Sequence, residues 1–443
     1  MAVTSIFHFS LPSKSSPSTP PFKTSHSLLS SPNFRPLRII CCLSNHRSDD
    51  ENPTTSNSTI NSLRVVFAAG GTGGRVYPAV AIADELLLAY PTAQILFLGT
   101  PNSTESAAVP SAGYEFDTVL ASQLAHPIIS PQNLLLPLHV IKSVIASYKK
   151  LIDFKPHIVI GTGGYVSFPI CLAAKLINGV KLAIQEQNSV PGFANWVLSH
   201  FADIVFVVLN STVECFPRKK KCLVCGNPVR LTLKQHVPKS VARLHFFPRS
   251  RKGEDLEAKV LLILGGSLGA NAINIAMLNL YYQMLLENKN LYIIWQTGVK
   301  TFDEMDSLVK NHPRLHLTPF MHSLHLAYAA ADLVVSRAGA MTCSEILATG
   351  KPSILIPSPH EDEGHQFRNA SIMADMAGST VINEDELDST TLASAIQEIL
   401  GDGTKMADLS ERALRVSKPN ASTEIVQHIG SLIDLSTRKA KQH

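Results

Sequence analysis

A short apolar run that breaks into glycines constrains the fold of this chain more than any other stretch. Residues 65–69 are apolar, residues 70–74 read Gly-Gly-Thr-Gly-Gly, and an amphipathic segment runs from Pro78 to Tyr90. This order predicts a buried strand, a tight turn and the start of a helix. Glycine lets a ligand approach the backbone closely, and a helix N-terminus offers unpaired N–H groups and a partial positive charge. The stretch therefore favours a site for an anion or a sugar phosphate.

The same order returns in the second half of the chain. A strand at 259–264 runs into Gly-Gly-Ser-Leu-Gly-Ala at 265–270 and a helix at 271–286. Strands and helices alternate around both turns, which predicts parallel sheets that bind ligands at the carboxyl ends of their strands. The other expected strands are 95–98, 157–160, 182–184, 204–208, 292–295, 315–317, 333–335 and 353–356. The economical interpretation is an α/β chain with two Rossmann-like domains that face each other across a cleft.

Changes in composition divide the chain further. We expect a first domain at 61–230, a basic, proline-containing linker without sustained periodicity at 231–258, and a second domain at 259–419. The final helix, at about 420–438, is expected to pack back on the first domain. Cys222 and Cys225 form a CxxC pair with Cys215 nearby, but no second pair follows, so a structural role is favoured over a metal or redox site.

The N-terminal segment differs from the rest in charge. Residues 1–48 contain five Lys or Arg and no acid, are rich in Ser and Pro, and lack a long apolar core. This composition predicts an organelle transit peptide of the plastid type within 1–60, with a disordered tail as the alternative. Removing those five from the 39 basic residues leaves 34 against 35 acidic ones, so the body gives no argument for a nucleic-acid partner.

Spacing excludes two common nucleotide-binding classes. A dinucleotide fingerprint needs a third glycine where this chain has Val76, and an acid near the end of the second strand, which instead reads Leu98-Gly99-Thr100. No G-x-x-x-x-G-K-[ST] element is present, which argues against a P-loop hydrolase. A nucleotide-sugar glycosyltransferase with two such domains, the GT-B class, remains.

Seven motifs narrow that class. They are GGTGG at 70–74, GTGGYVSFP at 161–169, EQN at 186–188, GNPVR at 226–230, GGSLGA at 265–270, SRAGAMTCSE at 336–345 and HQFRNA at 365–370. In this order they resemble the MurG family, the N-acetylglucosaminyltransferases that make lipid II of peptidoglycan from lipid I and UDP-N-acetylglucosamine. The resemblance runs from about Arg64 to the C-terminus and implies the GT-B fold.

The resemblance implies a donor site in the second domain. A helix N-terminus there would hold the diphosphate of UDP without a metal, and Glu345 resembles the family residue that bonds the ribose hydroxyls. An acid that only complements the helix dipole is the alternative for Glu345. The remaining implied donor contacts are Asn188, Arg230, Ser267, Arg337, Ala340, Met341, Thr342, His365 and Gln366. UDP-N-acetylglucosamine would be a substrate, so no cofactor is expected.

The first domain, by the same resemblance, binds the lipid-linked acceptor. Two glycine turns at adjacent strand ends suit the diphosphate of lipid I. The implied acceptor contacts are Gly71, Thr72, Gly73, Gly74, Gly163, Gly164 and Tyr165. Residues 127–150 are apolar with basic residues at the end, which predicts either docking on a membrane surface or a buried amphipathic helix.

One position departs from the family pattern. The family usually has histidine after the GGTGG turn, where this chain has Arg75. Arginine stays protonated and cannot act as a base, but it can bind a phosphate bidentately. Glu186 is then the candidate base. The expected reaction is inverting transfer of N-acetylglucosamine to lipid I. The alternatives are a plastid lipid hexosyltransferase of the galactolipid-synthase type and a catalytically silent homologue that acts as a membrane binding or scaffold protein.

Overall fold

The computed structural model of the protein describes residues 62–121, 135–248, 258–359 and 364–440. Contacts group residues 59–443 into one compact unit, to which all described residues belong. The predicted transit peptide and the start of the predicted membrane segment, 127–134, lie outside the described residues.

The first half of the unit forms a seven-stranded sheet whose strand pairs are all parallel, in the order β3-β2-β1-β4-β5-β6-β7. Its strands are β1 (Arg64–Ala68), β2 (Gln94–Gly99), β3 (Glu115–Thr118), β4 (Ile158–Gly161), β5 (Lys181–Gln185), β6 (Ile204–Val207) and β7 (Cys222–Val224). Its helices are α1 (Gly73–Ala89), α2 (Thr104–Ser111), α3 (Leu136–Phe154), α4 (Gly164–Lys175), α5 (Phe193–Ser199) and α6 (Asn210–Glu214), with a 3-10 turn at Lys219–Lys221.

The second half forms a six-stranded sheet, again with parallel pairs, in the order β10-β9-β8-β11-β12-β13. Its strands are β8 (Lys259–Leu264), β9 (Leu291–Gln296), β10 (Leu315–Thr318), β11 (Leu333–Ser336), β12 (Ser353–Leu355) and β13 (Thr380–Val381). Its helices are α7 (Lys239–Phe246), α8 (Asn271–Glu287), α9 (Phe302–Leu308), α10 (Leu324–Ala330), α11 (Ala340–Thr349), α12 (His365–Ala377), α13 (Ser389–Leu400) and α14 (Gly403–Val416), with 3-10 turns at Leu231–Lys234 and Glu384–Glu386. Helix α15 (Ala421–Ala440) follows them in the sequence.

Alternate side chains of each central strand enter different cores. Val65 and Phe67 of β1 pack in one cluster, while Val66 and Ala68 pack in another. Parallel sheets are covered on both faces, so their strands are apolar throughout rather than alternating, which explains the continuous run at 65–69. The two parallel sheets with alternating helices confirm the predicted α/β fold class with two Rossmann-like domains.

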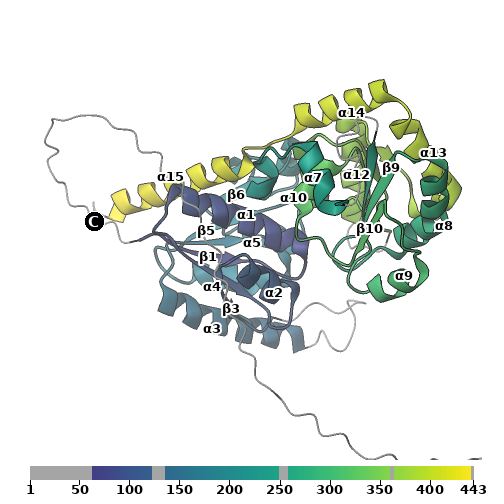
Figure 1. Cartoon of the computed structure of the whole chain (residues 1–443). Helices are drawn as coiled ribbons and strands as arrows, with labels where there is room; N and C mark the ends of the chain where they lie inside the picture. The colour runs from purple at the N-terminus through teal and green to yellow at the C-terminus, as the bar shows by residue number, and fades with distance from the viewer. Residues whose placement is uncertain (1–61, 122–134, 249–257, 360–363, 441–443) are drawn as a thin grey trace, which may run out of the picture. The chain divides into compact units, whose positions relative to one another are not determined.

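Helix α15 belongs to the first core although it ends the chain. Ile425, Val426 and Ile429 are buried in the cluster that also contains Val65 and Phe67. Figure 1 shows α15 alongside α1, where the two helices are in contact. The first domain therefore includes α15 as well as the elements from β1 to β7.

The predicted linker at 231–258 was wrong for its central part, where α7 forms. Ala242 and Phe246 are buried in the core of the second domain. Arg243 Nη2 lies 3.0 Å from Asp332 Oδ2 at the start of β11, and Lys239 forms an ion pair with the same carboxylate. The basic residues that suggested a solvated linker thus attach α7 to the second sheet.

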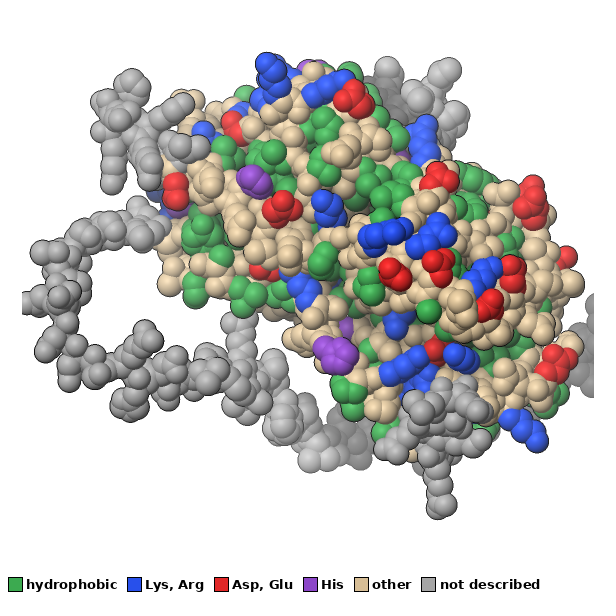
Figure 2. Space-filling view, turned by 90° about the horizontal axis from the view of Figure 1, so that it is seen from above, with side chains coloured by type: hydrophobic (Ala, Val, Ile, Leu, Met, Phe, Trp, Pro, Cys, Tyr) green, Lys and Arg blue, Asp and Glu red, His purple; other side chains and the backbone are tan. Residues whose placement is uncertain are grey.

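Acidic and basic side chains lie intermixed on the face shown in Figure 2. This distribution agrees with the near-neutral body of the chain, in which 34 basic residues meet 35 acidic ones once the five of the N-terminal segment are removed from the 39. No helix within the described ranges combines the length and the apolar character needed to cross a membrane.

Two glycines hold the donor-side turn against its neighbour. A Cβ on Gly298, whose φ is +94°, would lie 2.1 Å from both the Cα and the N of Gly269. Gly298→Ala is therefore expected to lower the free energy of unfolding by about 3 kcal/mol, because backbone must move to admit the methyl group. Denaturant unfolding measures this loss.

Gly266→Ala is the matched control for that prediction. Gly266 also has a positive φ, +78°, but a Cβ there would meet no atom within 4 Å. Only backbone strain should appear, about 1 kcal/mol. Equal losses in the two variants would contradict the packing argument.

Candidate active site

Each sheet has a switch point at its centre. In the first sheet, β2 lies on one side of β1 and β4 lies on the other. In the second sheet, β9 and β11 lie on the two sides of β8 in the same way. Ligands of such sheets bind in the crevice at the carboxyl ends of the two strands beside the switch point. The four turns that follow β1, β4, β8 and β11 are therefore the expected walls of a site, and they contain the predicted glycine motifs.

The Arg75 side chain lies between the two glycine turns of the first domain, which contain Gly71 and Gly164. A Cβ on Gly71 would lie 3.3 Å from Arg75 Nη1, and a Cβ on Gly164 would lie 2.7 Å from the same atom. Gly71 and Gly164 have φ values of +92° and +86°, so both positions also require glycine for backbone reasons. Tyr165 contacts Gly71 as well, with Cε1 3.3 Å from the position of its Cβ. The structure thus brings the predicted acceptor residues of both turns together around one cation.

The Arg75 side chain has neither a hydrogen bond nor an ion pair with any described residue. Nearby, the N-cap residues of α1 and α4, Thr72 and Gly163, make no side-chain capping hydrogen bond. Unpaired N–H groups at two helix starts lie near one unpaired guanidinium, and groups of these kinds bind phosphate.

Glu105 binds the backbone of the glycine turn at 70–74 and was not identified from the sequence. This buried carboxylate accepts hydrogen bonds from the backbone N of Gly71 at 3.1 Å, from the N of Thr100 at 3.1 Å and from the hydroxyl of Thr100 at 2.7 Å. Burial alone would raise the pKa of Glu105, but the hydrogen bonds outweigh it and hold the pKa below its ordinary value. Glu105 is therefore an ionised group that fixes the turn.

Glu186, the predicted base, is enclosed by donors. Its carboxylate accepts bonds from the backbone N of Asn188 at 2.9 Å, the side chain of Asn188 at 3.1 Å, the N of Gly192 at 3.1 Å and the side chain of Asn195 at 2.8 Å. Burial raises the pKa of Glu186 despite these bonds. With 2% of its surface exposed, Glu186 shapes the loop after β5, and its role as a base stays a prediction.

The donor side is organised around α11. Gly339 precedes the helix without a side-chain cap, so the N–H groups of Ala340, Met341 and Thr342 lack partners within the helix. Glu345 follows one turn later and is buried, with 4% of its surface exposed. No group of three or more His, Cys, Asp or Glu suited to a metal occurs in the described part of the chain.

Glu345 lies between a phenol and a guanidinium. Tyr328 Oη donates to Glu345 Oε2 at 3.3 Å, and Arg230 Nε lies 3.8 Å from Glu345 Oε1. Burial raises the pKa of Glu345, while the charge of Arg230 and the Tyr328 hydrogen bond act in the opposite direction. Burial and the neighbouring Glu345 raise the pKa of Tyr328 well above its ordinary value, so Tyr328 remains a donor. The structure brings Glu345 and Arg230 together, as a donor site requires.

Other predicted donor residues have structural partners. Arg337 forms an ion pair with Glu384 and donates to the carbonyl of Ile356 at 3.2 Å, while its contact with the donor diphosphate stays a prediction. Gln366 is buried, and its Oε1 accepts from the backbone N of Ser358 at 3.0 Å.

The remaining predicted donor contacts lie at the ends of elements. Ser267 lies partly exposed in the turn after β8, and its carbonyl accepts from Val299 N at 3.1 Å. His365 is the first residue of α12, and Asn188 lies in the loop after β5.

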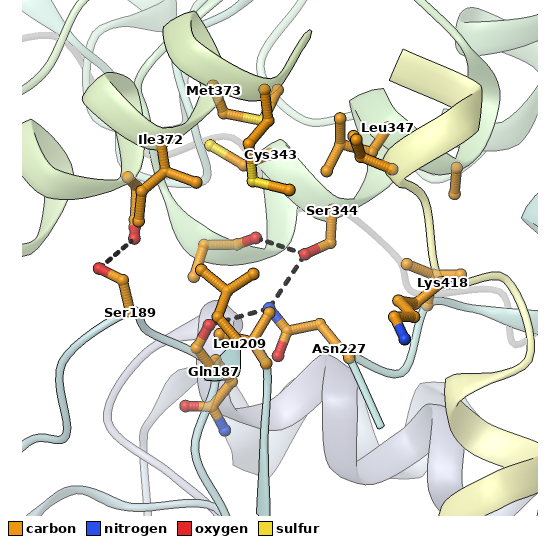
Figure 3. A pocket seen from close by; sticks show the side chains of 18 of the residues that line it. Gln187, Ser189, Leu209, Asn227, Cys343, Ser344, Leu347, Ile372, Met373 and Lys418 are labelled. Atoms are coloured by element: carbon orange, nitrogen blue, oxygen red, sulfur yellow. Dashed lines mark hydrogen bonds between the residues drawn. The ribbon is translucent and has the colours of Figure 1, made fainter. Parts of the chain in front are cut away.

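A cavity of about 380 Å³ lies on the opposite face of α11 from Glu345. Figure 3 shows the Asn227 and Ser344 side chains pointing toward each other across it, with 2.9 Å between Asn227 Nδ2 and Ser344 Oγ. Ser189 Oγ and Asn369 Oδ1 form a second bond between the two halves at 3.3 Å. These polar contacts join the loops after β5 and β7 to α11 and α12, and they fix how the donor helix faces the first domain.

This fold, with uncapped helix starts at paired switch points, defines a two-domain nucleotide-sugar glycosyltransferase. Residues 65–207 match the glycosyltransferase family 28 N-terminal domain, and residues 260–428 match the glycosyltransferase family 28 C-terminal domain. The chain belongs to the MurG family of these enzymes.

Individual relatives agree with this assignment. The chain is 36% identical over 370 residues to a protein of Salinibacter ruber, covering 84% of this chain and 97% of the relative. It is 37% identical over 372 residues to one of Christiangramia forsetii, covering 84% and 98%. Both carry the name UDP-N-acetylglucosamine–N-acetylmuramyl-(pentapeptide) pyrophosphoryl-undecaprenol N-acetylglucosamine transferase. The crystal structure of Acinetobacter baumannii MurG is similar with a TM-score of 0.62 and 26% identity, covering 84% of this chain and 99% of that one.

Proposed function

We propose that this chain transfers N-acetylglucosamine from UDP-N-acetylglucosamine to lipid I and so forms lipid II of peptidoglycan. The observation that carries the proposal is the match to relatives named for this reaction, at 36% identity over 97% of the length of one of them. The site described above supplies groups suited to each part of the reaction.

The donor half of the reaction needs groups that stabilise departing UDP. Charge develops on the diphosphate as the bond to the sugar breaks, and preorganised donors aimed at that charge lower the barrier. The N-terminus of α11 and Arg230 are those donors, while Glu345 accepts hydrogen bonds from the ribose. An acceptor hydroxyl displaces UDP from the opposite side of the sugar, which inverts the anomeric centre.

The acceptor half uses the surface around Arg75. Its guanidinium lies against Gly71 and Gly164 and binds the diphosphate of the lipid-linked acceptor in place of the family histidine. Because arginine keeps its proton, Arg75 contributes charge and geometry rather than base catalysis.

Helix α3 is the proposed contact with the membrane. Five apolar side chains spaced three or four residues apart are 38–55% exposed on it, namely Leu138, Ile141, Ile145, Tyr148 and Ile152. Lys142 and Lys149 are exposed on the same helix. A continuous apolar stripe with basic neighbours is the pattern of a helix that lies in the surface of an anionic bilayer.

Ile145→Glu is expected to weaken binding to vesicles that contain anionic lipid by about tenfold or more, because a charge replaces a side chain that would enter the bilayer. Vesicle sedimentation of the full chain measures this. Ile275→Glu is the control, since Ile275 is 55% exposed on α8 of the second domain. Equal binding by both variants would argue against α3 as the docking surface.

One assay tests the reaction. The purified full chain is given UDP-N-acetylglucosamine with lipid I in vesicles, and separately UDP-galactose with diacylglycerol. Lipid II from the first pair is the expected product. Product from the second pair alone would favour a galactolipid-type enzyme, and UDP binding without turnover of either pair would favour a silent homologue.

The acid-free, Ser- and Pro-rich composition of residues 1–48 supports a plastid location, on the stromal side of a membrane. A fluorescent tag at the C-terminus of the full chain tests this. Fluorescence confined to the cytosol would contradict it.

A further inference from the structure

Arg230 is held beside Glu345 by an aromatic ring of helix α1. Its guanidinium carbon lies 3.8 Å from the centroid of the Tyr77 ring. The Arg230 side chain makes no hydrogen bond to any described residue, and its Nε is buried without such a partner. A long side chain of this kind has many rotamers, so the ring and the carboxylate of Glu345, 3.8 Å from Nε, are what restrict it.

Tyr77 belongs to the acceptor side. It lies in the first turns of α1, directly after the glycine turn at 70–74. A Cβ on Gly73 would lie 3.2 Å from Tyr77 Cε2, so the ring rests on the backbone of that turn. A shift of the turn must therefore shift the ring.

A second contact keeps the same two segments together. Lys234 Nζ lies 3.2 Å from Glu85 Oε2, two turns further along α1. Residues 230–234 are thus attached to α1 at both ends of the segment. The position of Arg230 follows the position of α1.

We propose that Tyr77 is a positioning residue that holds Arg230 for the donor diphosphate and couples it to the acceptor-side glycine turn. The inference rests on the proposed function, because it takes a nucleoside diphosphate as the ligand of Arg230. In this proposal Tyr77 acts through Arg230 and not by its own contact with a reacting group. Its ring fixes the charge that does, and the turn that carries the ring is the one that meets the acceptor.

UDP binding to the full chain, measured by calorimetry without acceptor, tests this proposal. Tyr77→Leu is expected to weaken UDP about 3- to 30-fold, while Tyr77→Phe, which keeps the ring, stays within about twofold of the parent. In the double variant Tyr77→Leu/Arg230→Ala, the loss is expected to equal that of Arg230→Ala alone. Losses that add, or unchanged UDP affinity in Tyr77→Leu, would overturn the proposal.

A glycine pair tests the coupling to the turn. Gly73→Ala places a methyl group against the ring, whereas at Gly74 the nearest atom to a new Cβ would be Thr72 Oγ1 at 3.8 Å. Gly73→Ala is expected to weaken UDP severalfold more than Gly74→Ala does, and equal affinities would overturn the coupling. Thermal melting of each variant separates this effect from unfolding. The proposed reaction and the role of Tyr77 can fail separately. If the chain does not transfer sugar to lipid I but the UDP affinities of the variants follow the expected order, lipid I is not the acceptor and the role of Tyr77 is still supported.

Discussion

Replacing Glu345 with alanine is expected to weaken UDP binding about 10- to 100-fold, the value of hydrogen bonds made to a charged group. The buried carboxylate would otherwise accept from the ribose, and its removal also leaves Tyr328 and Arg230 without their nearest acceptor. Calorimetry with UDP measures the loss. If Glu345 only complemented the helix dipole, the loss would be about fivefold or less.

The pH dependence of UDP binding distinguishes these roles further. Burial raises the pKa of Glu345, and ribose hydroxyls donate to the ionised form. Affinity should therefore rise with pH as Glu345 loses its proton, and Glu345→Gln should remove that rise. Glu411→Ala, on the exposed surface of α14, is the matched control and should bind UDP like the parent.

Replacing Glu105 with alanine is expected to lower the free energy of unfolding by about 3 kcal/mol, because buried donors lose their acceptor. The turn at Gly71 loses its support at the same time, so the KM for the lipid acceptor should rise. Denaturant unfolding and acceptor kinetics measure the two effects. Glu115→Ala is the control, since Glu115 is exposed on the edge strand β3.

The contribution of Glu105 to stability should depend on pH. Its pKa in the folded chain lies below the ordinary value of 4.5, so the folded state favours the ionised form. The stabilisation is present above about pH 4.5 and is lost as the pH falls through the lowered pKa. The difference in unfolding free energy between the parent and Glu105→Ala should shrink in that range. A difference that stays constant down to pH 3 would show that the charge is irrelevant.

Local patterns were sufficient to predict the fold. Continuous apolar runs and glycine turns are short-range signals, so the central strands of both sheets could be located from them. The edge strands β3, β7 and β13 were missed, since edge strands are short and only partly buried. Helix α7 was missed because Lys239 and Arg243 look solvated until Asp332, about 90 residues further on, is placed beside them.

The sequence predicted the site less completely than the fold. Motifs located the turns, but the state of each side chain depends on partners that the motifs do not identify. Arg337 is neutralised by Glu384, and Glu186 is enclosed by donors from the loop and helix that follow it. Tyr77 contacts an arginine 153 positions later in the numbering, at 230. None of these pairings leaves a periodic or compositional trace.

The packing of α15 has a consequence for biosynthesis. Ile425, Val426 and Ile429 complete the core of the first domain, and all six strands of the second sheet lie in sequence between them and the rest of that core. During synthesis the second domain can therefore reach its final packing before the first one does. Part of the apolar surface of the first domain stays uncovered until α15 has been synthesised. Contacts between segments so far apart in sequence are expected to slow the folding of the first domain.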